Sequence, residues 1–225
     1  MTRFPARHEV PKVSVFASLL RMTTKYGFPH VREQLVKDLR GAYPTKWEAY
    51  QAAEVLGEDV FGSPKPHPNA VLNLFLEQNI KFALPFAAYR ASVGGFADLT
   101  SDKPGAVLPR LTLASIVHGR GEVRRAMTLI ARTVAYVVDF GVCTERVCIL
   151  NVSMNPTQRR VEALGKLFDI MADVDEGDVL SPPSFRTLVC VHCAKRLEMV
   201  HLGCRKKFIW GALPGLLGWG SWEGV

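Results

Sequence analysis

Four cysteines in the last third of the sequence have the type and spacing to bind a metal ion. Cys143 and Cys148 have four residues between them, and Cys190 and Cys193 form a C-x-x-C pair. Zinc takes four soft or borderline ligands in a tetrahedron, and a pair with two to four intervening residues supplies two thiolates from one tight turn. The two pairs therefore predict one structural zinc ion.

Three further residues are spare ligands for this site: Cys204, His192 and His201. The separation between Cys148 and Cys190 is longer than that of a compact zinc ribbon or finger. An alternative therefore stays open, in which the thiols are small buried hydrophobic groups on helix faces. A redox role for the C-x-x-C pair is disfavoured, because no βαβ unit precedes Cys190.

The sequence lacks the residue patterns of common enzymes. It contains no Gly-x-Ser-x-Gly elbow, and the glycines between residues 215 and 220 have no lysine at the phosphate-binding position. The acidic residues 173–178 do not fit the register of an EF-hand loop. We therefore predict a protein without catalytic residues, which is not an enzyme.

A short basic run and two tryptophans near the C-terminus form a candidate interaction surface: Arg205, Lys206, Lys207, Trp210 and Trp222. We expect the three basic residues on the exposed side of the last helix, and the tryptophans in contact with the apolar tail. The formal net charge of +7 favours acidic partners. However, basic residues are spread along the chain with few interleaved aromatics, so a nucleic-acid partner is not expected.

The compartment is predicted from what the sequence lacks. No apolar stretch reaches the roughly 20 residues that span a bilayer, so we expect no membrane partner. The N-terminus has no apolar signal region, and five cysteines is an odd number for a disulfide framework. These features predict an intracellular protein, cytoplasmic or nuclear, with reduced thiols.

Apolar residues recur at helical spacing along most of the chain, and alternating strand patterns are scarce. We predict an all-α fold, an irregular array of antiparallel helical pairs with a small cysteine-rich C-terminal element. A capping box at Thr45 should start the third helix, and Gly119 and Gly121 should separate two later helices. The last helix should start near Ser181 and end at Pro214. The expected domains are a disordered tail at 1–12, helical segments at 13–57 and 67–140, and a cysteine-paired region at 141–225.

Several of these motifs resemble the region that follows the BTB/POZ fold in basidiomycete BTB domain-containing proteins. The N-terminal part of the chain resembles that family's "LLRLSTKY…LR…YP" motif, and the C-terminal part resembles its C-terminal signature. The matching residues are Leu19-Leu20-Arg21-Met22-Thr23-Thr24-Lys25-Tyr26, Val31-Arg32, Ala42-Tyr43-Pro44-Thr45, His67-Pro68 to Tyr89, Cys143 with Cys148, Cys190-Val191-His192-Cys193, Arg205 to Trp210, and Leu213-Pro214.

The resemblance implies a non-enzymatic, adaptor-type module of a fungal BTB-domain-like protein, which binds a protein partner not identified by the sequence. Family members place the BTB fold before the first matching helix, and here only residues 1–12 precede it. Homodimerisation through that fold is therefore not expected, and its absence should leave Phe16 and Leu20 exposed. The alternative hypothesis is a zinc-dependent regulatory or nucleic-acid-binding protein that uses the basic C-terminal helix.

Overall fold

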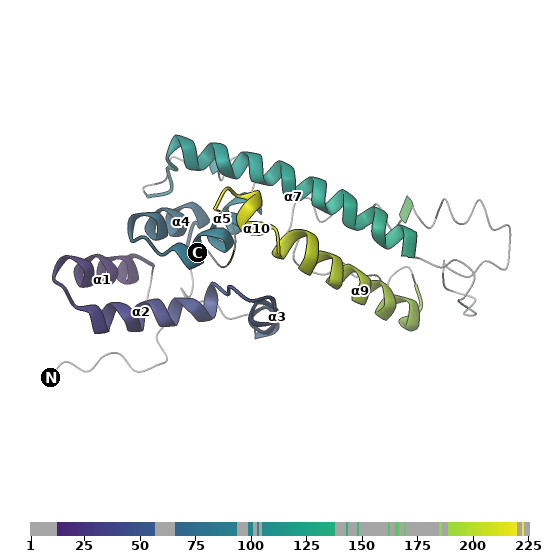
Figure 1. The fold of residues 1–225 in the computed structure, drawn as a ribbon, viewed down its shortest axis with the longest axis horizontal. Coiled ribbons are helices and arrows are strands. Elements are labelled where there is room, and N and C mark those ends of the chain that lie inside the picture. Colours follow the sequence, from purple (N-terminus) through teal and green to yellow (C-terminus); the bar gives the residue numbers. More distant parts are fainter. Residues whose placement is uncertain are drawn as a thin grey trace. The chain divides into compact units, whose positions relative to one another are not determined.

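The structure is a computed structural model that describes residues 13–56, 66–93, 99–100, 103, 105–137, 143, 148, 162, 165–166, 169, 185, 189–219 and 222. The regular elements in these ranges are all helices, which confirms the predicted all-α fold (Figure 1). The predicted tail at 1–12 and most of the proline-rich loop at 57–68 lie outside them. None of the described helices is both long and apolar enough to cross a bilayer.

The chain divides into two compact units. The first comprises Met1–Ile116 and Leu217–Val225, and the second comprises Val117–Leu216. The division falls inside the long helix α7, Arg110–Val137. All four paired cysteines lie in the second unit.

The first unit begins with a helical pair, α1 (Val13–Lys25) and α2 (Pro29–Ala42). Gly27 between them has φ +67, and the N–H of Phe28 donates to the carbonyl of Thr23 at 2.9 Å. This is the Schellman arrangement, in which a left-handed residue lets the chain satisfy the last carbonyls of the helix.

The inner face of α1 is part of the core. Phe16 is 2% exposed and Leu20 is fully buried, so the expectation that they would be exposed is wrong. They lie one turn apart, and burying such a pair contributes roughly 3–6 kcal/mol of hydrophobic free energy. The helix is therefore anchored through this face.

Helix α3 (Trp47–Leu56) begins later than the sequence indicates. The N–H of Tyr50 donates to the carbonyl of Lys46 at 3.0 Å, so Lys46 precedes the first helical turn and the predicted capping box at Thr45 is wrong. The aromatic ring of Tyr50 lies 5.7 Å from that of Phe86, edge to face. This contact ties α3 to the helical hairpin that follows.

That hairpin consists of α4 (Pro68–Glu77), a short 3₁₀ turn η1 (Lys81–Ala83) and α5 (Leu84–Val93). The two helices pack against each other, as the sequence predicts (Figure 1). Asn79 takes the left-handed conformation at the end of α4, with φ 52, since no glycine is present there.

In the second unit, α7 runs without a break through Gly119 and Gly121, so the predicted separation into two helices is wrong. Glycine in a helix interior costs only about 1 kcal/mol. The apolar side chains of Ile116, Val123 and Ile130 recur every seven residues and are all buried, which outweighs that cost.

The helix that begins at the C-x-x-C pair, α9, spans Val191–Arg205, so the predicted start near Ser181 is wrong. It continues into η4 (Lys206–Trp210), a wider turn in which the N–H of Gly211 donates to the carbonyl of Lys206 at 2.9 Å. A short helix, α10 (Leu213–Leu216), follows.

Gly27 offers a test of the turn between α1 and α2. A Cβ at Gly27 would meet no atom within 4 Å, so Gly27→Ala is disfavoured by the positive φ alone and should lower the free energy of unfolding by about 1 kcal/mol. Gly121→Ala is the matched control, because Gly121 is also uncrowded but lies inside a helix. It should stabilise by a similar amount in chemical denaturation. Equal effects of the two substitutions would contradict the assigned turn.

Candidate metal centre

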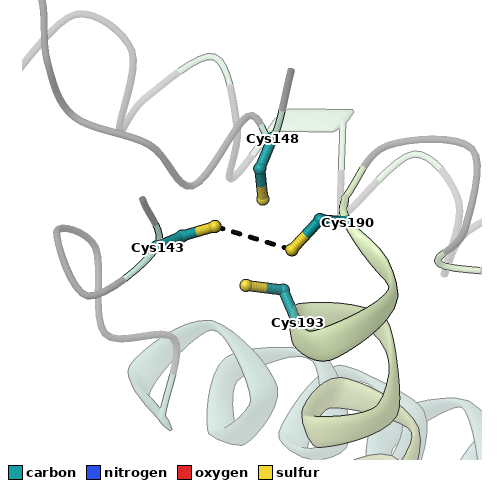
Figure 2. Close-up of side chains that lie close together, drawn as sticks. All are labelled: Cys143, Cys148, Cys190 and Cys193. Atoms are coloured by element: carbon teal, nitrogen blue, oxygen red, sulfur yellow. Dashed lines mark hydrogen bonds between the residues drawn. The ribbon is translucent and has the colours of Figure 1, made fainter. Parts of the chain in front are cut away.

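The four predicted cysteines converge. The sulfur atoms of Cys143, Cys148, Cys190 and Cys193 all lie within 4.8 Å of one another. Figure 2 shows the four side chains pointing towards one another. Among the described residues, this is the only group of three or more histidine, cysteine or acidic side chains arranged to hold a metal ion. The two pairs predicted from spacing therefore form one cluster.

The separations match those of a tetrahedral thiolate site. A metal–sulfur bond of about 2.3 Å gives sulfur–sulfur edges of about 3.8 Å in a tetrahedron. The sulfurs of Cys143 and Cys190 are 3.5 Å apart, and the other separations reach at most 4.8 Å. A metal ion would need only sub-ångström to about one ångström adjustments of the side chains.

The sulfurs are not joined as disulfides. All five cysteines are free, and the closest pair is far outside the roughly 2.05 Å of a disulfide bond. Cys148 is buried, while Cys143, Cys190 and Cys193 are half-buried. The cluster is therefore partly shielded from solvent, with four thiol groups facing one another.

Helix α9 places the C-x-x-C pair. Cys190 is the N-cap residue, with an extended backbone (φ −64, ψ 163), and Cys193 is in the first turn. The N-terminal N–H groups of a helix lack partners within the helix and carry a partial positive charge. The sulfur of the N-cap residue Cys190 therefore lies where a thiolate is stabilised.

The pKa values of two thiols in the cluster, Cys190 and Cys193, are shifted in opposite directions. The backbone N–H of Cys193 is the main cause that lowers the pKa of Cys190 to about 7, against the opposing effect of burial. No capping hydrogen bond from a helix N–H to the Cys190 side chain is present. Burial, followed by the neighbouring thiols, raises the pKa of Cys193. Only a bound cation would let all four sulfurs ionise together.

The three spare ligands do not join the cluster. His192 is exposed, while Cys204 and His201 are buried on α9. Burial raises the pKa of the Cys204 thiol, and the ring of His201 contacts that of Phe185 with centroids 5.9 Å apart. Cys204 and His201 therefore belong to the packed face of the helix, and four cysteines form the cluster without any of the three spare ligands.

The predicted interaction residues divide into two groups. Lys206 and Lys207 are exposed as expected. Arg205 is only 2% exposed, so its prediction as part of an exposed basic side is wrong. Trp210 is buried and Trp222 is half-buried.

The position of Arg205 follows from the buried row of α9. Ala194, Leu197 and His201 recur at three- and four-residue spacing, and Arg205 is the next member of that row. The sequence predicts an apolar row of Leu197, Val200, Cys204 and Phe208 on this helix. Leu197 and Cys204 are buried as expected, whereas Val200 and Phe208 are half-buried. The buried face therefore lies partly to one side of the predicted row and includes the polar side chains of His201 and Arg205.

No protein-family model, curated protein or solved structure matches this chain. The resemblance to the region after the BTB fold therefore remains a prediction from sequence motifs. The geometry of the cysteine cluster is the main basis for assigning a function.

His201 makes stability depend on pH. Burial, with a smaller effect of the Arg205 charge, lowers the pKa of His201 to about 3. Neither ring nitrogen forms a hydrogen bond within the described part of the chain. In the unfolded chain the histidine titrates near its usual pKa of about 6.5. Its neutral form therefore favours folding above that pH, and this contribution is lost as the pH falls from about 6.5 towards 3.

We expect the free energy of unfolding to fall by roughly 1–2 kcal/mol from pH 7 to pH 5 through this residue. The replacement His201→Leu should remove that part of the pH dependence, measured by denaturant unfolding at both pH values. His192→Leu is the control, since His192 is exposed on the same helix. An unchanged pH dependence in His201→Leu would contradict the assignment.

Proposed function

We propose that this chain is a non-enzymatic, helical protein–protein interaction module whose second unit is organised by a structural zinc ion. The ligands are Cys143, Cys148, Cys190 and Cys193. The observation that supports this most strongly is the convergence of the four sulfurs within 4.8 Å. Four thiolates in a tetrahedron are typical of zinc or of an iron–sulfur centre, and a mononuclear site of this size, with no further ligand among the described residues, favours zinc.

A closed set of four thiolates supports a structural role. Catalytic zinc keeps one position for water or substrate, whereas structural zinc is held by four protein ligands. The metal would connect residues 143 and 148 to the start of α9, across 47 positions from Cys143 to Cys190. Because an unfolded chain has no preformed site, the binding free energy becomes folding free energy.

The proposed role in protein–protein interaction rests on the sequence motifs that resemble the region after the BTB fold. This resemblance implies an adaptor in a fungal BTB-domain-like protein. Thiolate ligands require a reducing compartment, which fits an intracellular location. The partner in this proposal is another protein, and the zinc ion keeps the helices in the conformation that binds it.

The zinc site is tested by metal analysis of the purified chain. The expected result is about one equivalent of zinc per chain, which is lost in the double variant Cys190→Ser with Cys193→Ser because two of the four ligands are gone. Elemental analysis by mass spectrometry measures it directly.

Cys204→Ser is the matched control, because Cys204 is a buried cysteine on α9 that lies outside the cluster. It should retain the full zinc content. Wild-type protein without bound metal after expression in zinc-supplemented medium would refute the proposed site. A bound iron–sulfur centre, recognised by its visible absorption, would refute zinc as its occupant.

The alternative of nucleic-acid binding has less support. Two exposed lysines, Lys206 and Lys207, favour it, but the burial of Arg205 removes a third of the predicted basic cluster. Neutralising two phosphate contacts gives only a shallow salt dependence. We expect no binding to duplex or single-stranded oligonucleotides at low ionic strength in fluorescence anisotropy. Binding that is lost in Lys206→Glu with Lys207→Glu would favour the alternative.

A further inference from the structure

Two thiols of the cysteine cluster are in direct contact. The sulfurs of Cys143 and Cys190 are 3.5 Å apart (Figure 2). A disulfide bond is about 2.05 Å long, so the two sulfurs would have to approach each other by about 1.5 Å. When this movement is shared between two side chains, modest rotations about χ1 within one rotamer well supply it. The contact therefore places these two sulfurs for disulfide formation.

A small oxidant can reach this pair. Cys143 and Cys190 are both half-buried, and the two residues that follow Cys190, Val191 and His192, are exposed. Cys148 is only 2% exposed. Oxidation of cysteine follows solvent exposure and thiolate character, and cysteine binds zinc as the thiolate. Cys190 therefore combines the required chemical form with access from solvent.

The position of the pair in the sequence decides what a disulfide would do. A disulfide within the C-x-x-C pair, between Cys190 and Cys193, would stay inside the first turn of α9. A disulfide between Cys143 and Cys190 spans 47 positions and joins the same two segments that the zinc ion would connect. Only the second bond keeps the start of α9 attached to residue 143 when the metal is lost.

From this geometry we propose that Cys143 and Cys190 form an oxidation site, at which a peroxide converts the metal crosslink into a disulfide and releases the zinc ion. The proposal names a regulation of the structural zinc site, and in that respect it rests on the proposed function. Oxidation removes two of the four ligands, and Cys148 and Cys193 alone do not complete a tetrahedral site. The chain changes from a metal-linked form to a disulfide-linked form.

The reaction is a two-electron oxidation in two displacement steps. The thiolate of Cys190 attacks one oxygen of hydrogen peroxide, the O–O bond breaks, and hydroxide leaves as a sulfenic acid forms. The thiolate of Cys143 then attacks that sulfur, the S–S bond forms, and a second hydroxide leaves. Two protons from solvent convert the hydroxides to water. Both electrons end on the peroxide oxygens, so the released zinc ion keeps its charge.

The reducing compartment predicted for this chain makes the oxidised form transient. Disulfides in such compartments usually belong to catalytic or redox-sensing cysteines. Two molecules of a small thiol such as glutathione reduce the bond by thiol–disulfide exchange, and they are themselves joined as a disulfide. The regenerated thiols of Cys143 and Cys190 can bind zinc again. The oxidation is therefore reversible.

Peroxide treatment of the zinc-loaded full chain tests the proposal. A chromophoric chelator measures the released zinc, and peptide mass spectrometry without reduction locates the disulfide. We expect release of about one equivalent of zinc together with a crosslinked peptide pair that contains Cys143 and Cys190. A small thiol should restore zinc binding. Zinc that stays bound with all four thiols reduced, or a disulfide found only between Cys190 and Cys193, would overturn the proposal.

Two serine variants identify the reacting pair. Cys143→Ser should abolish the crosslink and leave Cys190 as a sulfenic acid, which a dimedone label detects. Cys204→Ser is the matched control, because Cys204 is a buried cysteine on α9 outside the cluster. It should show the same zinc release and the same crosslink as the wild type. A crosslink lost in Cys204→Ser would contradict the assigned pair.

The metal-free chain separates this proposal from the zinc site. Peroxide should join Cys143 to Cys190 there as well, because the contact between the two sulfurs belongs to the folded chain. A chain that binds no zinc but forms this crosslink would refute the metal site and leave the oxidation site standing. A chain that binds zinc but forms no such crosslink, with or without metal, would refute only the oxidation site.

Discussion

The second unit depends on one electrostatic constraint, which is that four thiol groups lie within 4.8 Å of one another. Such a cluster cannot ionise fully without a positive charge at its centre, because each thiolate raises the pKa of its neighbours. The N-terminus of α9 supplies part of that charge through its backbone N–H groups, and the pKa of Cys190 falls accordingly. A divalent cation would supply the rest, and in doing so would connect two distant segments of the chain.

Helix α9 combines this polar start with an unusually polar interior row. His201 and Arg205 are almost fully buried, one turn apart, on the face that also carries Leu197. Burying a polar group is costly unless its surroundings compensate, and neither ring nitrogen of His201 has a hydrogen-bond partner within the described part of the chain. A structural ion at the N-terminus of α9 would offset part of that cost.

Much of the fold and the candidate ligands could be predicted from the sequence. The spacing of Cys143 with Cys148 and of Cys190 with Cys193 predicted two ligand pairs, and the structure brings them together. Helical periodicity also predicted α4, and the apolar block from Phe82 to Val93 predicted its partner α5, which is buried on nearly all sides.

The predictions that the structure contradicts concern features set by tertiary packing, which local sequence patterns do not encode. Two glycines indicate a break in α7, but buried side chains on either side keep the helix continuous. The charge of Arg205 predicted a solvent-exposed side chain, but this residue lies on the buried face of α9. Helical spacing also does not show which apolar residues of α1 are covered: Phe16 and Leu20 are buried, whereas Met22 is exposed.

The most direct test of the central claim is hydrogen exchange in the first turn of α9, with and without a zinc chelator. The N–H of Ala194 donates to the carbonyl of Cys190 at 2.8 Å, so its exchange rate reports on that turn. If zinc holds the turn in place, the chelator should speed exchange there by tenfold or more and leave the α4–α5 hairpin of the first unit unchanged. Identical exchange at Ala194 in both conditions would contradict a structural metal at this site.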